Sequence, residues 1–261
     1  MLDEDSTEKS DSAILGSVSF GKYFNMANVN IGDEWRYDVY ANFTDYSIED
    51  DYDSLSIGVS LGPNFYSNAQ ISLPLGINTA WEGKHRTSQS VSFSPSYSRA
   101  INNKLRMSSQ LSFNYSEDIS SNDLENGLST GLNLNFQYNI NQTNMMEFQL
   151  ATQDNDANDL DYSRYKSDAI GASWNTMLNN IRVSVKPTYT KLYYDEPDPI
   201  DGGVERKDNR YTLNLNMYKS IKINSIDITP IFSFTWTKNN SNIDRHDYVR
   251  KQVSLQFRYQ F

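Results

Sequence analysis

The stretch that decides the predicted fold is Val253-Ser-Leu-Gln-Phe-Arg-Tyr-Gln-Phe261, the last nine residues of the chain. Side chains of an extended strand alternate between two faces, so the apolar and aromatic residues of this stretch share one face and the polar ones share the other. The apolar face consists of Val253, Leu255, Phe257, Tyr259 and Phe261. A strand with one apolar face, one polar face and an aromatic end suits a wall between lipid and water.

Similar alternation recurs along the chain and predicts about thirteen strands of about ten residues each. The expected strands are 13–24, 35–43, 55–61, 71–77, 91–97, 105–115, 132–140, 146–150, 169–174, 181–189, 211–217, 226–236 and 248–261. Pro74 and Pro95 fall inside two of them. Each removes a backbone donor from its strand, so we expect both prolines to mark β-bulges.

The connectors between the strands alternate in length from residue 101 onward. Short, Asn-rich connectors are expected at 101–103, 139–144, 177–180 and 219–224. Longer and mostly acidic ones are expected at 117–126, 153–164, 195–208 and 238–247. Outer-membrane barrels have tight periplasmic turns and longer extracellular loops, so the alternation favours that class and places the carboxyl end on the periplasmic side.

The sequence therefore predicts an all-β fold: an antiparallel up-and-down transmembrane β-barrel over residues 12–261, preceded by a flexible acidic segment at 1–11. Bacterial single-chain barrels have an even number of strands, so about fourteen is favoured, with the first strand absent or unrecognised, and about twelve is second. A soluble antiparallel barrel is the alternative. The first residues lack the apolar core of a signal peptide, so we expect a mature or shortened chain.

Composition limits the partners of the protein. The chain of 261 residues has a net charge of -10 and no cysteine. It has no apolar run of the ~20 residues that a membrane-spanning helix needs. The acidic balance argues against nucleic acid, and the lack of cysteine excludes disulfides and thiolate metal sites. We expect no cofactor and no metal, lipid of the bacterial outer membrane as the surrounding partner, and no nucleic acid.

Few residues could support catalysis or metal binding. The two histidines, His85 and His246, lie in predicted connectors, and no pattern fixes a nucleophile beside either of them. The acidic run that begins at Asp154 resembles a calcium loop. Its sixth and twelfth positions are Asp159 and Tyr165, where an EF-hand requires Gly and Glu. We therefore expect charged surface loops and a protein that is not an enzyme.

Charged residues on the polar face of the predicted strands should line the lumen of the barrel. They are Arg36, Arg106, Glu147, Arg182, Lys186, Asp227 and Arg258. A lining of mixed sign can select ions in a pore. It can equally serve only to satisfy the charges of a polar interior.

The tail from Ser241 to Phe261, with Ser241-Asn-Ile243 and then Tyr, Arg and Gln before the aromatic end, resembles the barrel domain of the surface lipoprotein assembly modifier family. Residues 37–46 and 52–63 also fit such barrels. The resemblance implies a barrel of about fourteen strands that helps to deliver lipoproteins to the cell surface, usually behind a periplasmic repeat domain. No such repeat is present in these residues. It also implies that the β-barrel assembly machinery recognises the terminal aromatic residues Phe257, Tyr259 and Phe261.

Several functions remain open at this point. The leading hypothesis is translocation or assembly of surface-exposed cargo, a lipoprotein or another protein, across the outer membrane. A general or substrate-selective porin is the first alternative. An exopolysaccharide-export barrel and a surface binding protein are the others.

Overall fold

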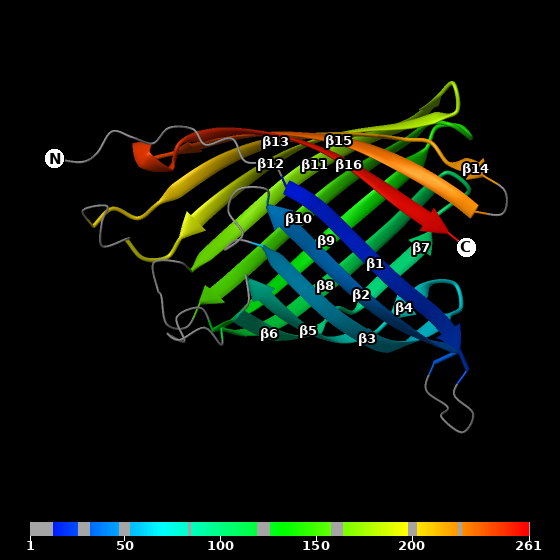
Figure 1. The fold of residues 1–261 in the computed structure, drawn as a ribbon, viewed down its shortest axis with the longest axis horizontal. Coiled ribbons are helices and arrows are strands. Elements are labelled where there is room, and N and C mark those ends of the chain that lie inside the picture. The colour runs from blue at the N-terminus through cyan, green and yellow to red at the C-terminus, as the bar shows by residue number, and fades with distance from the viewer. Residues whose placement is uncertain are drawn as a thin grey trace.

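The computed structural model describes residues 13–25, 32–46, 53–82, 85–118, 126–157, 164–197, 203–223 and 226–260. These residues form one antiparallel sheet of sixteen strands that curls into a barrel-like shape (Figure 1), which confirms the predicted all-β, antiparallel architecture. The strands are β1 (Ala13–Phe24), β2 (Glu34–Tyr46), β3 (Ser54–Tyr66), β4 (Gln70–Ser72), β5 (Leu75–Glu82), β6 (His85–Phe93), β7 (Ser96–Ala100), β8 (Leu105–Asp118), β9 (Gly127–Asn139), β10 (Met145–Ala157), β11 (Tyr165–Leu178), β12 (Ile181–Tyr194), β13 (Lys207–Tyr218), β14 (Ile221–Ile223), β15 (Ile226–Ser241) and β16 (Tyr248–Gln260). A single helical turn, η4 (Asp244–His246), precedes β16.

No helix in the described part of the chain is long and apolar enough to cross a membrane. The proposed flexible segment at 1–11 and the terminal Phe261 lie outside the described residues.

In three places, two labelled strands together make one interrupted pass across the sheet. The pairs are β4 with β5, β6 with β7, and β13 with β14. The register with the neighbouring strands is the same on both sides of each interruption. Sixteen strands less three give thirteen passes in the described residues. Thirteen passes match the thirteen strands that alternation predicts, and they are one fewer than the fourteen favoured with a first strand absent or unrecognised. The second choice of about twelve was wrong for the described residues, and the fourteenth strand rests on the even strand number of bacterial barrels.

The two prolines interrupt their strands without shifting the register, so the predicted bulges were wrong. The Pro74 carbonyl accepts a hydrogen bond from the Ser94 N–H at 3.1 Å, and the Pro95 carbonyl accepts one from the Leu111 N–H at 3.0 Å. Proline removes a donor from a ladder but keeps its acceptor, so the sheet continues past it. A register shift occurs instead between Ala80 and Trp81, where β5 pairs with β6.

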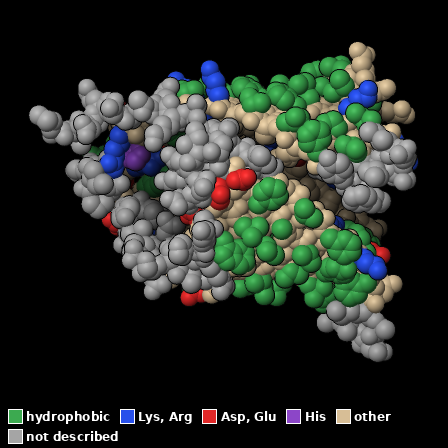
Figure 2. Space-filling view, in the orientation of Figure 1, with side chains coloured by type: hydrophobic (Ala, Val, Ile, Leu, Met, Phe, Trp, Pro, Cys, Tyr) green, Lys and Arg blue, Asp and Glu red, His purple; other side chains and the backbone are tan. Residues whose placement is uncertain are grey.

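The two faces of the sheet differ in polarity. In β9, Leu132, Leu134 and Phe136 lie on the outer face, and Asn133 and Asn135 lie on the inner face with their partners in β8 and β10. Hydrophobic side chains cover much of the outer surface in Figure 2. Among the described residues the buried hydrophobic core amounts to Leu192, which is 4% exposed. This distribution is the inverse of that in a water-soluble domain, where apolar side chains fill the interior.

From residue 101 onward the connections segregate by length between the two ends of the sheet, as predicted. Turns 101–104, 140–144 and 179–180 lie at what we call the short-turn end. The Asn102 side-chain oxygen accepts hydrogen bonds from the N–H groups of Lys104 and Leu105, both at 2.9 Å. Asn141 closes its turn in the same way. The opposite end, the long-connection end, carries segments such as 119–126 and 195–206. Asparagine side chains thus stabilise the short turns through local hydrogen bonds.

Gly62 on β3 provides a first testable prediction. A Cβ atom there would lie 2.6 Å from the Cα atom of Pro74, which is backbone and cannot rotate away. We expect Gly62→Ala to lower the free energy of unfolding by about 1–3 kcal/mol through overpacking. Urea titration in lipid vesicles, followed by tryptophan fluorescence, measures the loss.

Gly171→Ala on β11 is the matched control. Its nearest neighbour would be the Thr188 hydroxyl at 3.2 Å, which can turn aside. A loss at Gly171 equal to that at Gly62 contradicts the proposed backbone clash.

Candidate functional site: the inner wall of the sheet

Five of the charged residues predicted to face the lumen lie on the inner face of the curled sheet. They are Arg36, Arg106, Glu147, Arg182 and Lys186, and each is in register with inner-face residues of its neighbours. Asp227 and Arg258 occupy inner-face positions in the ladder between β15 and β16, but their side chains lie outside the described part of the structure. On the opposite, outer face, Phe257 is exposed and Tyr259 follows it in register.

Arg36 is held by its own neighbours near the short-turn end. Its guanidinium donates to the Asp38 carboxylate through Nε at 2.7 Å and through Nη2 at 2.6 Å, and to the Tyr23 hydroxyl at 2.8 Å. Residues two apart in a strand share a face, so Arg36 and Asp38 meet on the inner wall and link β2 to Tyr23 of β1. This cluster joins the two strands of the first hairpin by side chains, in addition to their backbone ladder. Of the three residues in this cluster, alternation of side chains predicts only Arg36 as a lumen-lining charge.

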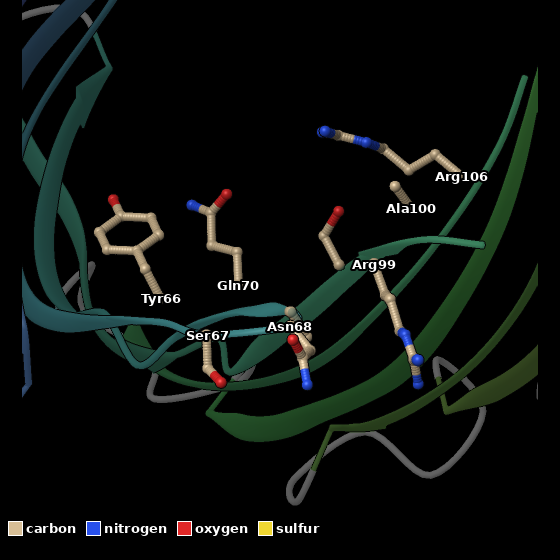
Figure 3. Close-up of a pocket in the computed structure, with 9 residues that line it drawn as sticks. Tyr66, Ser67, Asn68, Gln70, Arg99, Ala100 and Arg106 are labelled. Atoms are coloured by element: carbon tan, nitrogen blue, oxygen red, sulfur yellow. The ribbon is translucent and has the colours of Figure 1, made fainter. Parts of the chain in front are cut away.

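A pocket of about 200 Å³ opens at the same end between β3, β4, β7 and β8. Tyr66, Gln70 and Arg106 project to one side of the sheet, and Arg99 projects to the other (Figure 3). The pocket brings a cation, an amide and a phenol into one polar recess. Alternation of side chains predicts Arg106 but not its neighbours, because their proximity depends on which strands lie side by side.

The middle of the inner wall carries charges that are paired with amides and hydroxyls. Glu147 accepts hydrogen bonds from the Asn135 amide and from the Ser173 hydroxyl, the latter at 3.4 Å. Lys186 donates to the Gln149 side-chain oxygen at 2.6 Å. Asn135, Glu147, Gln149 and Lys186 border a recess of about 260 Å³. In this part of the inner wall, single charges thus lie among neutral polar groups that hydrogen-bond to them.

A buried ion pair lies near the long-connection end. The guanidinium of Arg206 binds the Asp208 carboxylate through Nε at 3.0 Å and through Nη2 at 2.5 Å. The Asp208 side chain is 0% exposed and that of Arg206 is 19% exposed. Arg206 also stacks over the Tyr194 ring, with its Cζ atom 4.4 Å from the ring centre. Burial opposes the charge of Arg206, yet the hydrogen bonds to Asp208 raise its pKa above the ordinary value.

Two of the candidates for catalysis or metal binding, His246 and Asp154, have side chains in the described part of the structure. Each contacts neighbouring residues of the sheet and its connections. The His246 carbonyl accepts a hydrogen bond from the Asn239 amide at 3.0 Å, and its ring nitrogen Nε2 accepts one from Arg245 at 3.3 Å. Asp154 pairs with Lys166, and Asp156 pairs with Arg164 at 2.9 Å. Residues 158–163 of that region and the His85 side chain lie outside the described part of the structure. The described residues contain no group of three or more His, Cys, Asp or Glu that could hold a metal ion.

Comparison with known proteins decides the family. Residues 4–261 match the sequence model of the family described as surface lipoprotein assembly modifier. The chain belongs to this family. The resemblance seen in the tail is thus confirmed over nearly the whole chain. The inner wall and the outer apolar face described above are therefore features of a member of this family. A search of curated proteins found no match.

Proposed function

We propose that this chain spans the bacterial outer membrane as a barrel and acts there in the translocation or assembly of lipoproteins that reach the cell surface. The family match over residues 4–261 carries the proposal. The proposed partners are outer-membrane lipid, a protein cargo and a periplasmic repeat domain. The role is non-enzymatic, and it needs neither a cofactor nor a metal.

The distribution of side chains supports a membrane location. Apolar residues on the outer face, such as Phe148, Leu150 and Ile170, are exposed. Exposed apolar surface of this extent is unfavourable in water and favourable in contact with lipid. The inner wall is polar, as expected for an interior that water can enter. Lipid-facing strands with a polar interior are the arrangement of outer-membrane barrels.

The two ends of the sheet support an orientation. Short turns belong on the periplasmic side of such barrels, and longer connections belong outside the cell. β16 ends at the short-turn end, so Phe257, Tyr259 and Phe261 would be presented to the periplasm. We propose that the β-barrel assembly machinery recognises these three residues as the assembly signal. The apolar register of Phe257 and Tyr259 on β16 is consistent with recognition by strand pairing.

The proposal is tested by surface labelling in intact cells. The gene that encodes the chain is expressed in a Gram-negative host together with each outer-membrane lipoprotein of its own bacterium, one at a time and epitope-tagged. We expect at least one lipoprotein to become accessible to antibody only when the chain is present, with its total amount unchanged after permeabilisation. If no lipoprotein of the set changes its accessibility, the proposal fails.

An ion-conducting pore is the second candidate, because charges of both signs lie on the inner wall. If the lumen conducts, Lys186→Glu should shift ion preference towards cations, since it replaces a positive charge beside Gln149 with a negative one. Reversal potentials in planar bilayers measure the shift. Lys191→Glu is the control, because Lys191 lies on the outer face of the same strand. Absence of steady conductance argues against a porin and leaves the assembly role standing.

A further inference from the structure

The charges on the outer face of the sheet are separated by sign near the long-connection end. In the described strands β12, β13, β15 and β16 this face carries lysines and no acidic residue. The lysines are Lys191, Lys207, Lys238 and Lys251. Acidic residues of the outer face, such as Asp154 and Asp168, lie on other strands, and Asp168 of β11 marks the border opposite Lys191. One side of this end is therefore positively charged in a chain whose net charge is -10.

Lys238 and Lys251 are close neighbours on the outer face. Lys251 lies opposite Trp236 in the ladder between β15 and β16, and Lys238 is two residues beyond Trp236 on β15. Residues on such a diagonal have Cα atoms about 7–8 Å apart, within reach of long side chains. Both lysines are exposed, and neither makes an ion pair or a hydrogen bond with another residue in the described part of the chain. Two adjacent cations without an acidic partner favour an anion from outside the chain.

Lys191 lies at the same height on the sheet as these two lysines. Lys238 is opposite Tyr211 of β13, and Tyr211 is opposite Tyr189 of β12. Lys191 is two residues beyond Tyr189. From Lys251 to Lys191 the positions thus advance four residues, about 13 Å, towards the long-connection end while they cross three strand spacings, about 14 Å.

The tilt of the strands converts this diagonal into a level row. In Figure 1, β15 and β16 slope across the long axis of the sheet, so a row of paired residues shifts towards the short-turn end from β16 to β12. The advance of the lysines runs the other way. Its slope is close to the strand tilt of about 35–45° in barrels, so the two shifts cancel. The three lysines therefore follow the rim of the sheet.

The surroundings of the lysines are those of a membrane surface. Tyr189 and Tyr211 lie against each other on this face, with ring centres 5.1 Å apart, and Tyr211 is opposite Lys238. Towards the short-turn end the same strands present apolar residues such as Leu213 and Phe234. Tyrosine prefers the boundary between hydrocarbon and headgroups, where lysine extends its ammonium group to anionic headgroups. The apolar surface directly beside the lysines favours a lipid over a water-soluble acidic partner.

We propose that Lys191, Lys238 and Lys251, which we call the lysine patch, bind the phosphate groups of lipid in the outer leaflet of the membrane. The proposal rests on the proposed function, which places the chain in the outer membrane with its long-connection end outside the cell. The ligand is the phosphorylated glycolipid of that leaflet. Lys207 is not part of the patch, because it pairs with Glu205 at 3.7 Å.

The test measures lipid binding by the full chain purified in a neutral detergent. The probe is lipid A with both of its phosphates, and the comparison is the same glycolipid without phosphates. Native mass spectrometry measures the amount bound. We expect Lys191→Gln, Lys238→Gln and Lys251→Gln each to weaken binding of the phosphorylated lipid about fivefold, because each removes one cation at the headgroup. Arginine at the same three positions keeps the charge and should keep the binding.

A matched triple variant separates the patch from the net charge of the chain. Lys22→Gln, Lys104→Gln and Lys166→Gln together remove three charges elsewhere. Lys22 and Lys104 lie at the short-turn end, and Lys166 pairs with Asp154 at 3.8 Å. We expect this variant to bind lipid A like the unaltered chain, whereas glutamine at all three patch positions weakens binding about a hundredfold. Circular dichroism checks that each variant is folded, and the single variants replace a triple variant that is not.

Four results would overturn the proposal. Equal weakening by the two triple variants would reduce the effect to net charge. Equal binding of lipid A with and without phosphates would mean that the phosphates are not recognised. Complete competition by inorganic phosphate would make free phosphate the ligand. Displacement of lipid A by a decaglutamate peptide that binds more tightly would indicate an acidic protein partner.

The lipid-binding result is independent of lipoprotein delivery. If lipid A binds through the patch and no lipoprotein is delivered in the surface-labelling test, the assembly role fails and the lysine patch stands. If a lipoprotein is delivered and the purified chain shows no phosphate-dependent binding, the lysine patch fails and the assembly role stands.

Discussion

Leu134→Arg should destabilise the protein in a lipid bilayer by about 2–4 kcal/mol, the cost of a basic residue on the lipid face near the membrane centre. Leu134 lies on the outer face in the middle of β9, opposite Leu150 of β10. Its side chain belongs to the apolar surface that we propose faces lipid. Urea-dependent folding into phospholipid vesicles measures the change.

Asn133→Arg is the matched control, because Asn133 is the adjacent residue of the same strand and faces the inner wall. The same new charge then contacts water and polar groups, so we expect a much smaller loss of stability. Equal losses at positions 133 and 134 would contradict the assignment of the outer face to lipid. A soluble antiparallel barrel would give the opposite order of effects.

Arg206→Ala should cost about 3–5 kcal/mol of folding free energy, because it leaves the carboxylate of Asp208 buried without its partner. The side chain of Asp208 is 0% exposed, and both of its oxygens accept hydrogen bonds from Arg206. Asp208→Asn in the Arg206→Ala background removes the stranded charge and should recover part of the loss. A double-mutant cycle by urea titration measures the coupling between the two residues.

The pair formed by Arg36 and Asp38 is the comparison for this effect. Its side chains are 45% and 32% exposed, although its geometry is as close as that of the buried pair. Exposed ion pairs contribute about 0–1 kcal/mol, so Arg36→Ala should be mild. If Arg36→Ala and Arg206→Ala cost the same, burial does not explain the stability of the second pair.

The alternation of side chains allowed the strands to be predicted because it is a local property of the chain. The predicted strand at 13–24 has the bounds of β1. The predicted strand at 181–189 was too short, since β12 continues to Tyr194, and β13 begins at Lys207, within a predicted loop. Near the ends of the passes both faces become polar, as at Thr190 and Lys191. The apolar signal then fades although the ladder continues.

The candidate site was predictable only in part for a related reason. The face on which Glu147 or Lys186 lies follows from alternation within one strand. The partners Asn135 and Gln149 follow from the register between strands, which alternation within one strand does not specify. Arg206 and Asp208 were missed because they lie at the border of a long acidic connector. Their spacing of two residues, in phase with the strand that follows, was the signal that could have identified them.

The asparagine turns also have a consequence for the order in which the sheet forms. Asn102 and Asn141 close their turns through bonds within a few residues, and every described ladder joins passes that follow each other along the chain. Closing short loops costs little chain entropy, so hairpins can form early and add one to another. Only the meeting of β1 with β16 requires the two ends of the sheet to find each other. That step comes last, because it joins residues from the two ends of the chain.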